Sequence, residues 1–483
     1  YKVLGWGGWW GWDPVENSSL VPWLAAGVLV HLLSAARVRP TNLALAHLSA
    51  IFSYALALYG TFLARSGLLG DFSVHSFSGT GVGLWLVAVD AIAVLAGLSL
   101  LVWRAGKFPK GSPYPAHRSR EFFLLLGCLA LTFLAIIVFI GMSMPLLTGL
   151  GGDSAAVDTG FYTKTSLPLA ICMLLAMAVG SLLRYGEGQA SLPKALVGAV
   201  FAGAAAAGLV GVREVSSLVL AGAAAAAVFA SVLAWRGGAL RPAAAVTHAG
   251  AALALFTMAL TSAGMSTTLE FVPAEPQSFG RSSILYEGMD LSESRREKEY
   301  VFRVDGEEVR ALTKLSASGE DAAREPAIAH GAAGDIYIAP SPAAVGHEIV
   351  LQRGKAILEG DLAYRLEHVT EEPDPEDQDR RIFLAAIAVT DGETVDLAEV
   401  SLTAAGMKAA TESFAVLNGK RRLRLLGISE DRKNIMLQIL PALEEEARLP
   451  LTASVSEKPL LWLLWLGAAF VFVGTSCAVR RRC

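Results

Sequence analysis

Four tryptophans lie close together in a glycine-rich segment at the start of the chain: Trp6, Trp9, Trp10 and Trp12. The glycines between them let the backbone turn sharply and approach a bound molecule closely. Indole rings bury much apolar area and stack on flat partners, so the segment predicts a platform for a planar apolar ligand such as a porphyrin. An interfacial aromatic belt is the simpler interpretation, but a belt needs neither the glycines nor the polar run 13–17.

Two carboxylates follow the tryptophans. Asp13 and Glu16 lie where a helix is expected to begin near Pro14, because proline favours the first helical position and acidic groups stabilise a helix N-terminus. Two roles stay open for these carboxylates. They could orient a ligand on the platform or handle a proton there, or they could simply cap the helix.

Two histidines fall inside apolar stretches. His31 lies about 18 residues, or about 27 Å of helical rise, beyond Asp13, and His248 follows closely after Arg241. Ionisable side chains inside membrane spans are rare and face the protein interior, so both are candidate functional residues. At one depth they could supply the two axial ligands of a b-type haem, because neutral imidazole buries no net charge. Each could instead be a hydrogen-bonded histidine between helices.

A third histidine, His75, lies in a loop that follows Arg65. His75 could ligate an iron held on the tryptophan platform, and Arg65 could pair with a propionate, although an arginine there could also just reach to the lipid headgroups. The expected metal ligands are therefore His31, His248 and His75. The remaining histidines show no metal-ligand spacing and are predicted to be structural or exposed: His47, His117, His330, His347 and His368.

The composition is that of a membrane protein. Hydrophobic residues make up 53% of the chain, the formal net charge is −4, and the mean hydropathy is +0.48. No basic tract argues for nucleic-acid binding. The cysteines form no C-x-x-C pair, so they support neither a disulfide framework nor a thiol redox site: Cys128, Cys172, Cys477 and Cys483.

Apolar runs of membrane-spanning length occur near 18–35, 45–63, 82–103, 121–142, 166–183, 194–211, 215–235, 244–263 and 459–478. They predict a polytopic α-helical membrane protein with about nine transmembrane helices. Residues 264–458 instead show short alternating runs between Gly, Asp and Pro clusters, which is typical of a mostly β domain, either a sandwich or a small barrel. We therefore expect a tryptophan segment 1–17, a helical bundle 18–263 with a loop 64–81, a β-rich domain 264–458, and a last helix with a basic tail, 459–483.

Basic residues concentrate in alternate loops and at the C-terminal tail: Arg37, Arg39, Arg104, Lys107, Lys110, Arg118, Arg120, Arg184, Lys194, Arg236, Arg241, Arg480, Arg481 and Arg482. The positive-inside rule makes that side cytoplasmic. The tryptophan segment, the loop 64–81 and the β-rich domain would then all lie on the outer side of the membrane.

Several of these motifs together resemble one known family. Residues 6–24 read WGGWWGWDPVENSSLVPWL, a span with His31 follows, and GTFLARSG (60–67) and SVHSF (73–77) come next. The chain is therefore similar to the CcmF family, large subunits of the cytochrome c haem lyase of System I maturation and members of the haem-handling WWD superfamily. In that family further spans, with a first periplasmic histidine, would precede Tyr1.

The resemblance implies roles for these residues. Trp6, Trp9, Trp10, Trp12, Asp13 and His75 would form the catalytic periplasmic platform, with Arg65 also near the haem. His31 and His248 would hold a transmembrane b haem that supplies electrons. The reaction would attach haem vinyl groups to the CxxCH thiols of apocytochrome c.

The resemblance also implies a place and partners. The protein would lie in the bacterial inner membrane and work with a periplasmic haem chaperone, apocytochrome c, and thiol oxidoreductase-like and TPR-containing subunits. Two alternatives stay open. A haem transporter or exporter of the same superfamily would not require the large β insert, and a b-haem electron-transfer subunit would leave the tryptophan segment unexplained.

Overall fold

The computed structural model describes residues 10–69, 72–73, 75–76, 81–152, 154–186, 193–291, 297–315, 321–341, 346–373, 381–405, 408–411 and 413–480. The chain divides into two compact units. Of the described residues, those within Trp10–Gly264, Ala332–Gly334 and Lys458–Arg480 form the helical unit, and those within Met265–Gly331 and Asp335–Glu457 form the β unit.

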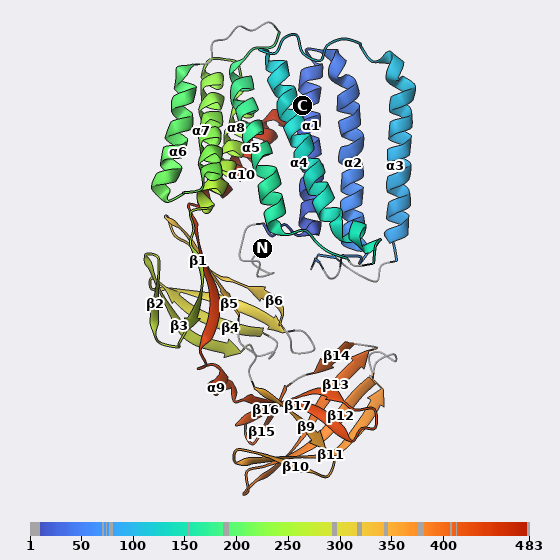
Figure 1. Ribbon diagram of the computed structural model, residues 1–483, viewed down its shortest axis with the longest axis vertical. Coiled ribbons are helices and arrows are strands. Elements are labelled where there is room, and N and C mark those ends of the chain that lie inside the picture. Colours follow the sequence, from blue (N-terminus) through green and yellow to red (C-terminus); the bar gives the residue numbers. More distant parts are fainter. Residues whose placement is uncertain are drawn as a thin grey trace. The chain divides into compact units, whose positions relative to one another are not determined.

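The helical unit contains nine helices in its described residues (Figure 1): α1 (Pro14–Ala36), α2 (Leu43–Arg65), α3 (Gly83–Arg104), α4 (Arg120–Gly149), α5 (Thr159–Leu182), α6 (Lys194–Val210), α7 (Val215–Arg236), α8 (Pro242–Thr261) and α10 (Trp462–Arg480). Eight of them are long and apolar enough to cross a membrane. The helix α6, with 17 residues, is shorter. The predicted fold class, a polytopic helical membrane protein with a β-rich part, is confirmed.

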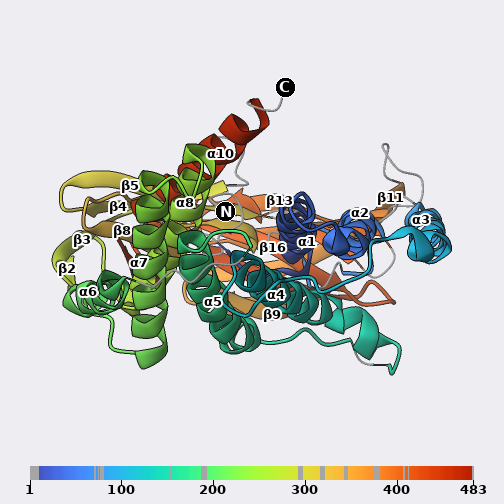
Figure 2. The same ribbon diagram turned by 90° about the horizontal axis from the view of Figure 1, so that it is seen from above.

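The helices pack in a chain of neighbours. α3 packs on α2, α2 on α1, α1 on α4, α4 on α5, and α5 on α7. α7 in turn contacts α6 and α8, and α8 packs on α10. Figure 2 shows the same unit from above, where α3, α2, α1, α4, α5 and α7 follow one another in this order.

Glycines allow the closest of these helix contacts. A Cβ added to Gly250 of α8 would lie 2.6 Å from the carbonyl oxygen of Gly467 in α10, and one added to Gly203 of α6 would lie 2.4 Å from Cβ of Ala225 in α7. Small residues at such crossings let the backbones approach and gain van der Waals contact. The Ala/Gly-rich region 194–235, where the division into spans is weakest in the sequence, is therefore a tightly packed helix pair.

The first lobe of the β unit has two sheets, with strand orders β1-β18-β8-β7 and β2-β3-β4-β5-β6. The strands are β1 (Ser266–Phe271), β2 (Pro276–Phe279), β3 (Ser282–Leu291), β4 (Glu297–Val304), β5 (Glu307–Leu315), β6 (Asp321–Glu325), β7 (Ala327–Ala329), β8 (Gly334–Pro340) and β18 (Leu451–Pro459). Side chains from both sheets form one core, in which Phe271, Ile284, Phe302 and Val455 are buried.

The second lobe has the sheets β10-β11-β12-β13-β14 and β15-β16-β17-β9. Its strands are β9 (His347–Gln352), β10 (Ala356–Glu359), β11 (Leu362–Pro373), β12 (Arg381–Thr390), β13 (Val395–Ala405), β14 (Lys408–Thr411), β15 (Ser413–Val416), β16 (Arg421–Ile428) and β17 (Asn434–Pro441). A separate core includes Leu351, Ile387, Leu425 and Leu437. The β-rich region thus has two hydrophobic cores, where the sequence analysis expected a single sandwich or barrel.

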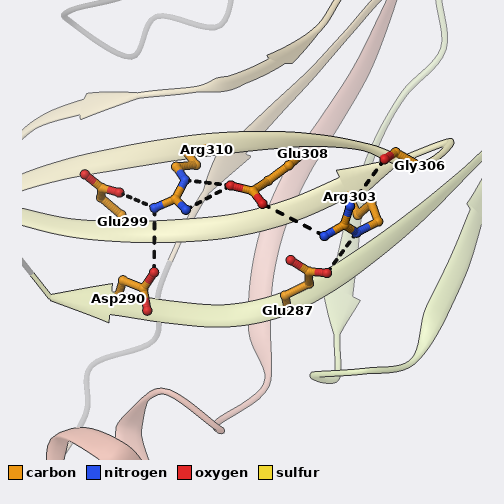
Figure 3. Close-up of polar contacts among 7 residues, drawn as sticks. All are labelled: Glu287, Asp290, Glu299, Arg303, Gly306, Glu308 and Arg310. Carbon is orange, nitrogen blue, oxygen red and sulfur yellow. Dashed lines mark hydrogen bonds and ion pairs between the residues drawn. The ribbon is translucent and has the colours of Figure 1, made fainter.

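One face of the first lobe carries an exposed ladder of ion pairs across β3, β4 and β5 (Figure 3). Arg310 Nη1 lies 2.8 Å from Glu299 Oε2 and 3.6 Å from Asp290 Oδ2. Arg303 Nε lies 2.9 Å from Glu287 Oε1. Ion pairs this exposed stabilise a fold little, so we interpret this ladder as a solvated face of the sheet.

Candidate functional site

Asp13 caps α1. Its carboxylate is nearly buried, with 8% of the residue exposed. The Oδ1 atom accepts hydrogen bonds from the backbone N–H groups of Val15 at 2.7 Å and Glu16 at 3.0 Å. With Pro14 at the first helical position, this is the arrangement in which an acceptor satisfies the unpaired donors of a helix start. Two roles were left open for Asp13, and these hydrogen bonds are those of a helix cap.

The same carboxylate also holds the loop that contains His75. Ser73 is buried, and its hydroxyl donates to Asp13 Oδ1 at 2.9 Å. The Ser73 hydroxyl oxygen accepts in turn from the backbone N–H of His75 at 3.1 Å. The hydroxyl of Ser76 donates to the carbonyl of Leu63, in the last turn of α2, at 3.5 Å. The loop is therefore attached to the start of α1 and to the end of α2, where Arg65 is the last helical residue.

Trp12 has an unusual backbone conformation. Its φ is 56°, in the left-handed region, which is a genuine outlier for a bulky residue. The amide nitrogen of Asn17 donates to the Trp12 carbonyl at 3.1 Å. The Gly11 N–H donates to Glu16 Oε2 at 3.0 Å. Strained residues held in this way cluster at functional sites, and Glu16 acts here as an anchor for the segment before the helix.

The described aromatic rings of this segment make two contacts. Trp10 and Trp12 lie edge to face, with centroids 6.3 Å apart. Trp12 also stacks on Tyr162 of α5, with centroids 4.5 Å apart and planes 3° apart. Trp6 and Trp9, two of the predicted platform residues, lie outside the described residues. Tyr162 and Ser73 are not among the site residues predicted from the sequence.

The indole nitrogen of Trp10 fits a ligand that accepts hydrogen bonds. Its Nε1 atom is buried and has no hydrogen-bond partner among the described residues. A buried donor left unpaired costs about 1–3 kcal/mol. A carboxylate such as a haem propionate would satisfy it, so the described part of the platform is compatible with the predicted porphyrin substrate.

His31 and His248 come together although they belong to different helices. The ring centroids lie 6.0 Å apart, and the ring planes are within 11° of parallel. α1 packs on α2 and α4, whereas α8 packs on α7 and α10, so the two rings meet across helices that are not close neighbours.

The ring nitrogens of this pair leave room for a metal ligand role. Nδ1 of His31 lies 2.7 Å from the Gly27 carbonyl oxygen, so Nδ1 carries the proton and Nε2 keeps a free electron pair. Nδ1 of His248 is buried and has no hydrogen-bond partner among the described residues. Both observations fit an axial ligand pair for a b haem, although the described residues contain no group of three or more His, Cys, Asp or Glu side chains placed to hold a metal ion.

The other histidines have ordinary partners. His47 Nδ1 lies 2.7 Å from the Leu43 carbonyl oxygen, and His117 packs edge-on against Phe122. In the β unit, His330 pairs with Asp335 and His347 with Glu359. His368 lies at a register shift between β11 and β12. These contacts are those of structural or surface histidines.

Comparisons with known proteins find sequence similarity to cytochrome c biogenesis proteins. The family described as "Cytochrome C assembly protein" matches residues 1–69. The cytochrome c-type biogenesis protein CcmF of Haemophilus influenzae is 36% identical over 193 residues, which is 40% of this chain and 29% of that protein. CcmF of Pseudomonas aeruginosa is 39% identical over 189 residues, or 39% of this chain and 28% of that protein.

A solved structure of "Cytochrome c Heme Lyase CcmF" aligns with 98% of this chain and 61% of its own, at 20% identity and a TM-score of 0.48. At that score the likeness supports no conclusion by itself. The sequence match spans less than a third of the two curated relatives. Over the matched residues, the resemblance expected from the tryptophan segment is confirmed: the chain is similar to the CcmF-type cytochrome c biogenesis proteins.

Proposed function

We propose that this chain is the haem-handling part of a cytochrome c haem lyase. The observation that carries the proposal is the bond sequence from Asp13 through Ser73 to His75. It holds a candidate iron ligand beside a strained tryptophan whose indole is partly accessible. A b-haem electron-transfer subunit needs only a histidine pair and would have no use for this second site.

The substrate haem would bind on Trp10 and Trp12, together with Trp6 and Trp9, with its iron on His75 and a propionate near Arg65. Each thioether forms when a cysteine thiol of the CxxCH motif adds across a haem vinyl group. The sulfur bonds to one vinyl carbon, the other takes the proton, and no electrons are gained or lost overall. Catalysis would come mainly from orienting the two reactants.

His31 and His248 would hold the resident b haem. When bound, that haem would supply an electron that keeps the substrate iron ferrous. The Gly27 carbonyl would fix the His31 ring and direct its Nε2 toward the iron, as second-shell acceptors do for metal-bound histidines.

The basic residues of alternate loops support an orientation with the tryptophan segment and the β unit on the periplasmic side of the inner membrane. The expected partners are a periplasmic haem chaperone, apocytochrome c, and thiol oxidoreductase-like and TPR-containing subunits. The β unit offers a large exposed surface on which such partners could dock.

The test is cytochrome c maturation in cells that depend on the full-length protein. We expect His75→Ala to abolish covalent haem attachment, seen by haem staining of a periplasmic reporter cytochrome. Ser73→Ala should lower it, because His75 loses its tether to Asp13. The control is His347→Ala, which removes an exposed histidine of the β unit.

Equal amounts of each variant in the membrane make the comparison valid. Normal haem attachment in His75→Ala would overturn the proposed role of the platform. A loss of attachment in His347→Ala as large as that in His75→Ala would show that the assay does not report on this site.

A further inference from the structure

We propose that Tyr162 is a positioning residue of the tryptophan platform. Its ring covers one face of Trp12 and fixes the plane in which the substrate haem meets that indole. The inference rests on the proposed lyase function, and it assigns a role to a residue of α5 about 150 residues from the tryptophan segment in sequence.

Tyr162 and Trp12 form a closely stacked pair of rings. Tyr162 is 2% exposed, and its ring lies parallel to the Trp12 ring within 3°, at a centroid distance of 4.5 Å. Trp12 itself remains half-buried. A ring that is stacked on one face can offer only its other face to a flat ligand, so the tyrosine determines which face the haem can use.

Tyr162 also packs tightly against α4. A Cβ added to Gly141 would lie 2.6 Å from Cε1 and 2.8 Å from the hydroxyl oxygen of Tyr162. The tyrosine ring therefore lies directly on the backbone of α4, where any larger residue would displace it. The position of the ring is thus set by a rigid helix on one side, and the ring in turn sets the position of Trp12.

The backbone of Trp12 depends on its surroundings. A tryptophan at φ 56° tends to relax unless its surroundings hold it. The Asn17 amide holds the carbonyl side of the residue, and Tyr162 holds the ring. Loss of the aromatic ring at position 162 would leave the indole with only one of these restraints.

Tyr59 provides a matched control. It packs against the same hydrophobic cluster as Tyr162, but its described contacts are with Ser143, Phe62 and Phe139. A tyrosine that serves only core packing should behave like Tyr59. A positioning residue should instead change the way haem binds, without a matching change in the fold.

The experiment measures hemin binding to the purified full-length protein by absorbance titration. We expect Tyr162→Leu to bind hemin roughly three- to tenfold more weakly and to change the visible circular dichroism of the bound haem, which reports on the aromatic groups around it. Tyr162→Phe should rescue both properties because it keeps the stack. Tyr59→Leu should match the wild type in both.

Two measurements check that each variant is folded: elution as a single species in size-exclusion chromatography, and the thermal unfolding temperature. If Tyr162→Leu does not accumulate, Gly141→Ala carries the test, because it displaces the tyrosine ring without removing it and should weaken binding in the same direction. Unchanged affinity and dichroism in the folded variant, or equal losses in Tyr59→Leu, would overturn the role of Tyr162. A wild-type protein that binds no hemin on the platform would overturn the proposed function itself.

Discussion

At the scale of single residues, hydrogen bonds decide which side chains are available for chemistry. The two imidazoles of the His31 and His248 pair differ in this respect: Nδ1 of His31 is engaged by the Gly27 carbonyl, whereas Nδ1 of His248 is buried and has no partner among the described residues. Asp13, in contrast, uses one oxygen for three hydrogen bonds. Its role is therefore better understood as support for His75 than as proton transfer.

The first prediction concerns the histidine pair. His31→Ala and His248→Ala should each abolish the reduced absorption spectrum of a bis-histidine b haem in the purified full-length protein, because one axial ligand is lost. His47→Ala is the matched control, since Nδ1 of His47 lies 2.7 Å from a carbonyl oxygen four residues earlier, just as in His31. An unchanged spectrum in either variant of the pair would make that histidine a packing residue.

The sequence predicts part of this site and misses another part for physical reasons. Tryptophans, carboxylates and histidines are rare enough in apolar segments to attract notice. Ser73 is an ordinary loop serine, and its position two residues before His75 was the only available signal. Tyr162 is one of several aromatic residues in the spans, and the stack on Trp12 depends on how α1, α4 and α5 pack, which a single sequence does not encode locally.

At the scale of elements, hydropathy locates the helices because membrane spans must be long and apolar. Local chemistry explains where some of them begin. α1 starts at Pro14 because Asp13 caps it, four residues before the apolar run at 18–35. Hydropathy does not indicate which helices pack against each other. That pairing depends on small residues where two helices cross, such as Gly250 and Gly467.

The second prediction concerns that crossing. Gly250→Val should lower the thermal unfolding temperature of the detergent-solubilised protein, at a cost of about 1–3 kcal/mol, because even a Cβ would lie 2.6 Å from the Gly467 carbonyl oxygen. Gly198→Val on α6 is the control, since a Cβ there meets no heavy atom within 4 Å. Equal unfolding temperatures for the two variants would contradict the close packing of α8 on α10.

The position of Gly250 adds a second expected effect. It lies two residues after His248 on α8, so a displaced helix should also disturb the histidine pair. We therefore expect a weaker b-haem spectrum in Gly250→Val and a normal one in Gly198→Val. If Gly250→Val were destabilised but kept a normal spectrum, the packing of α8 on α10 would not affect the His31 and His248 pair.

At the scale of the whole molecule, the β unit has more structure than its sequence pattern indicated. Alternating runs identify strands such as β4, β8, β9, β12 and β16, but they do not say which strands share a core. Two separate cores arise because the nine strands of the second lobe all lie between β8 and β18 in the chain. The insertion of one lobe between two strands of the other depends on which distant strands pair, and the local alternation of apolar residues does not indicate this.

A buried charge cluster links the two lobes. Glu446 of α9 (Leu443–Glu446) lies 2.7 Å from Lys298 Nζ of β4, and it also pairs with Arg422 of β16. The Glu446 side chain is only 6% exposed. Burial raises the pKa of Glu446, but the charges of Lys298 and Arg422 outweigh it, so that the pKa lies below its usual value.

The third prediction follows from this depressed pKa. A carboxylate with a lower pKa in the folded state stabilises that state above the unfolded pKa, about 4.3 for glutamate, and loses this contribution as the pH falls through the folded pKa. Glu446→Gln should therefore destabilise the β unit by about 3–5 kcal/mol at pH 7, because two cations stay buried without their partner. Below pH 4 the difference from the wild type should shrink.

Hydrogen–deuterium exchange of β4 and β16 in the full-length protein measures the effect. We expect faster exchange in both strands of Glu446→Gln at pH 7, relative to the wild type, since Glu446 joins one strand from each lobe. The control is Glu308→Gln, which removes an exposed carboxylate of the ladder in Figure 3 and should leave exchange nearly unchanged. Faster exchange in only one of the two strands would mean that Glu446 stabilises a single lobe and does not link the two.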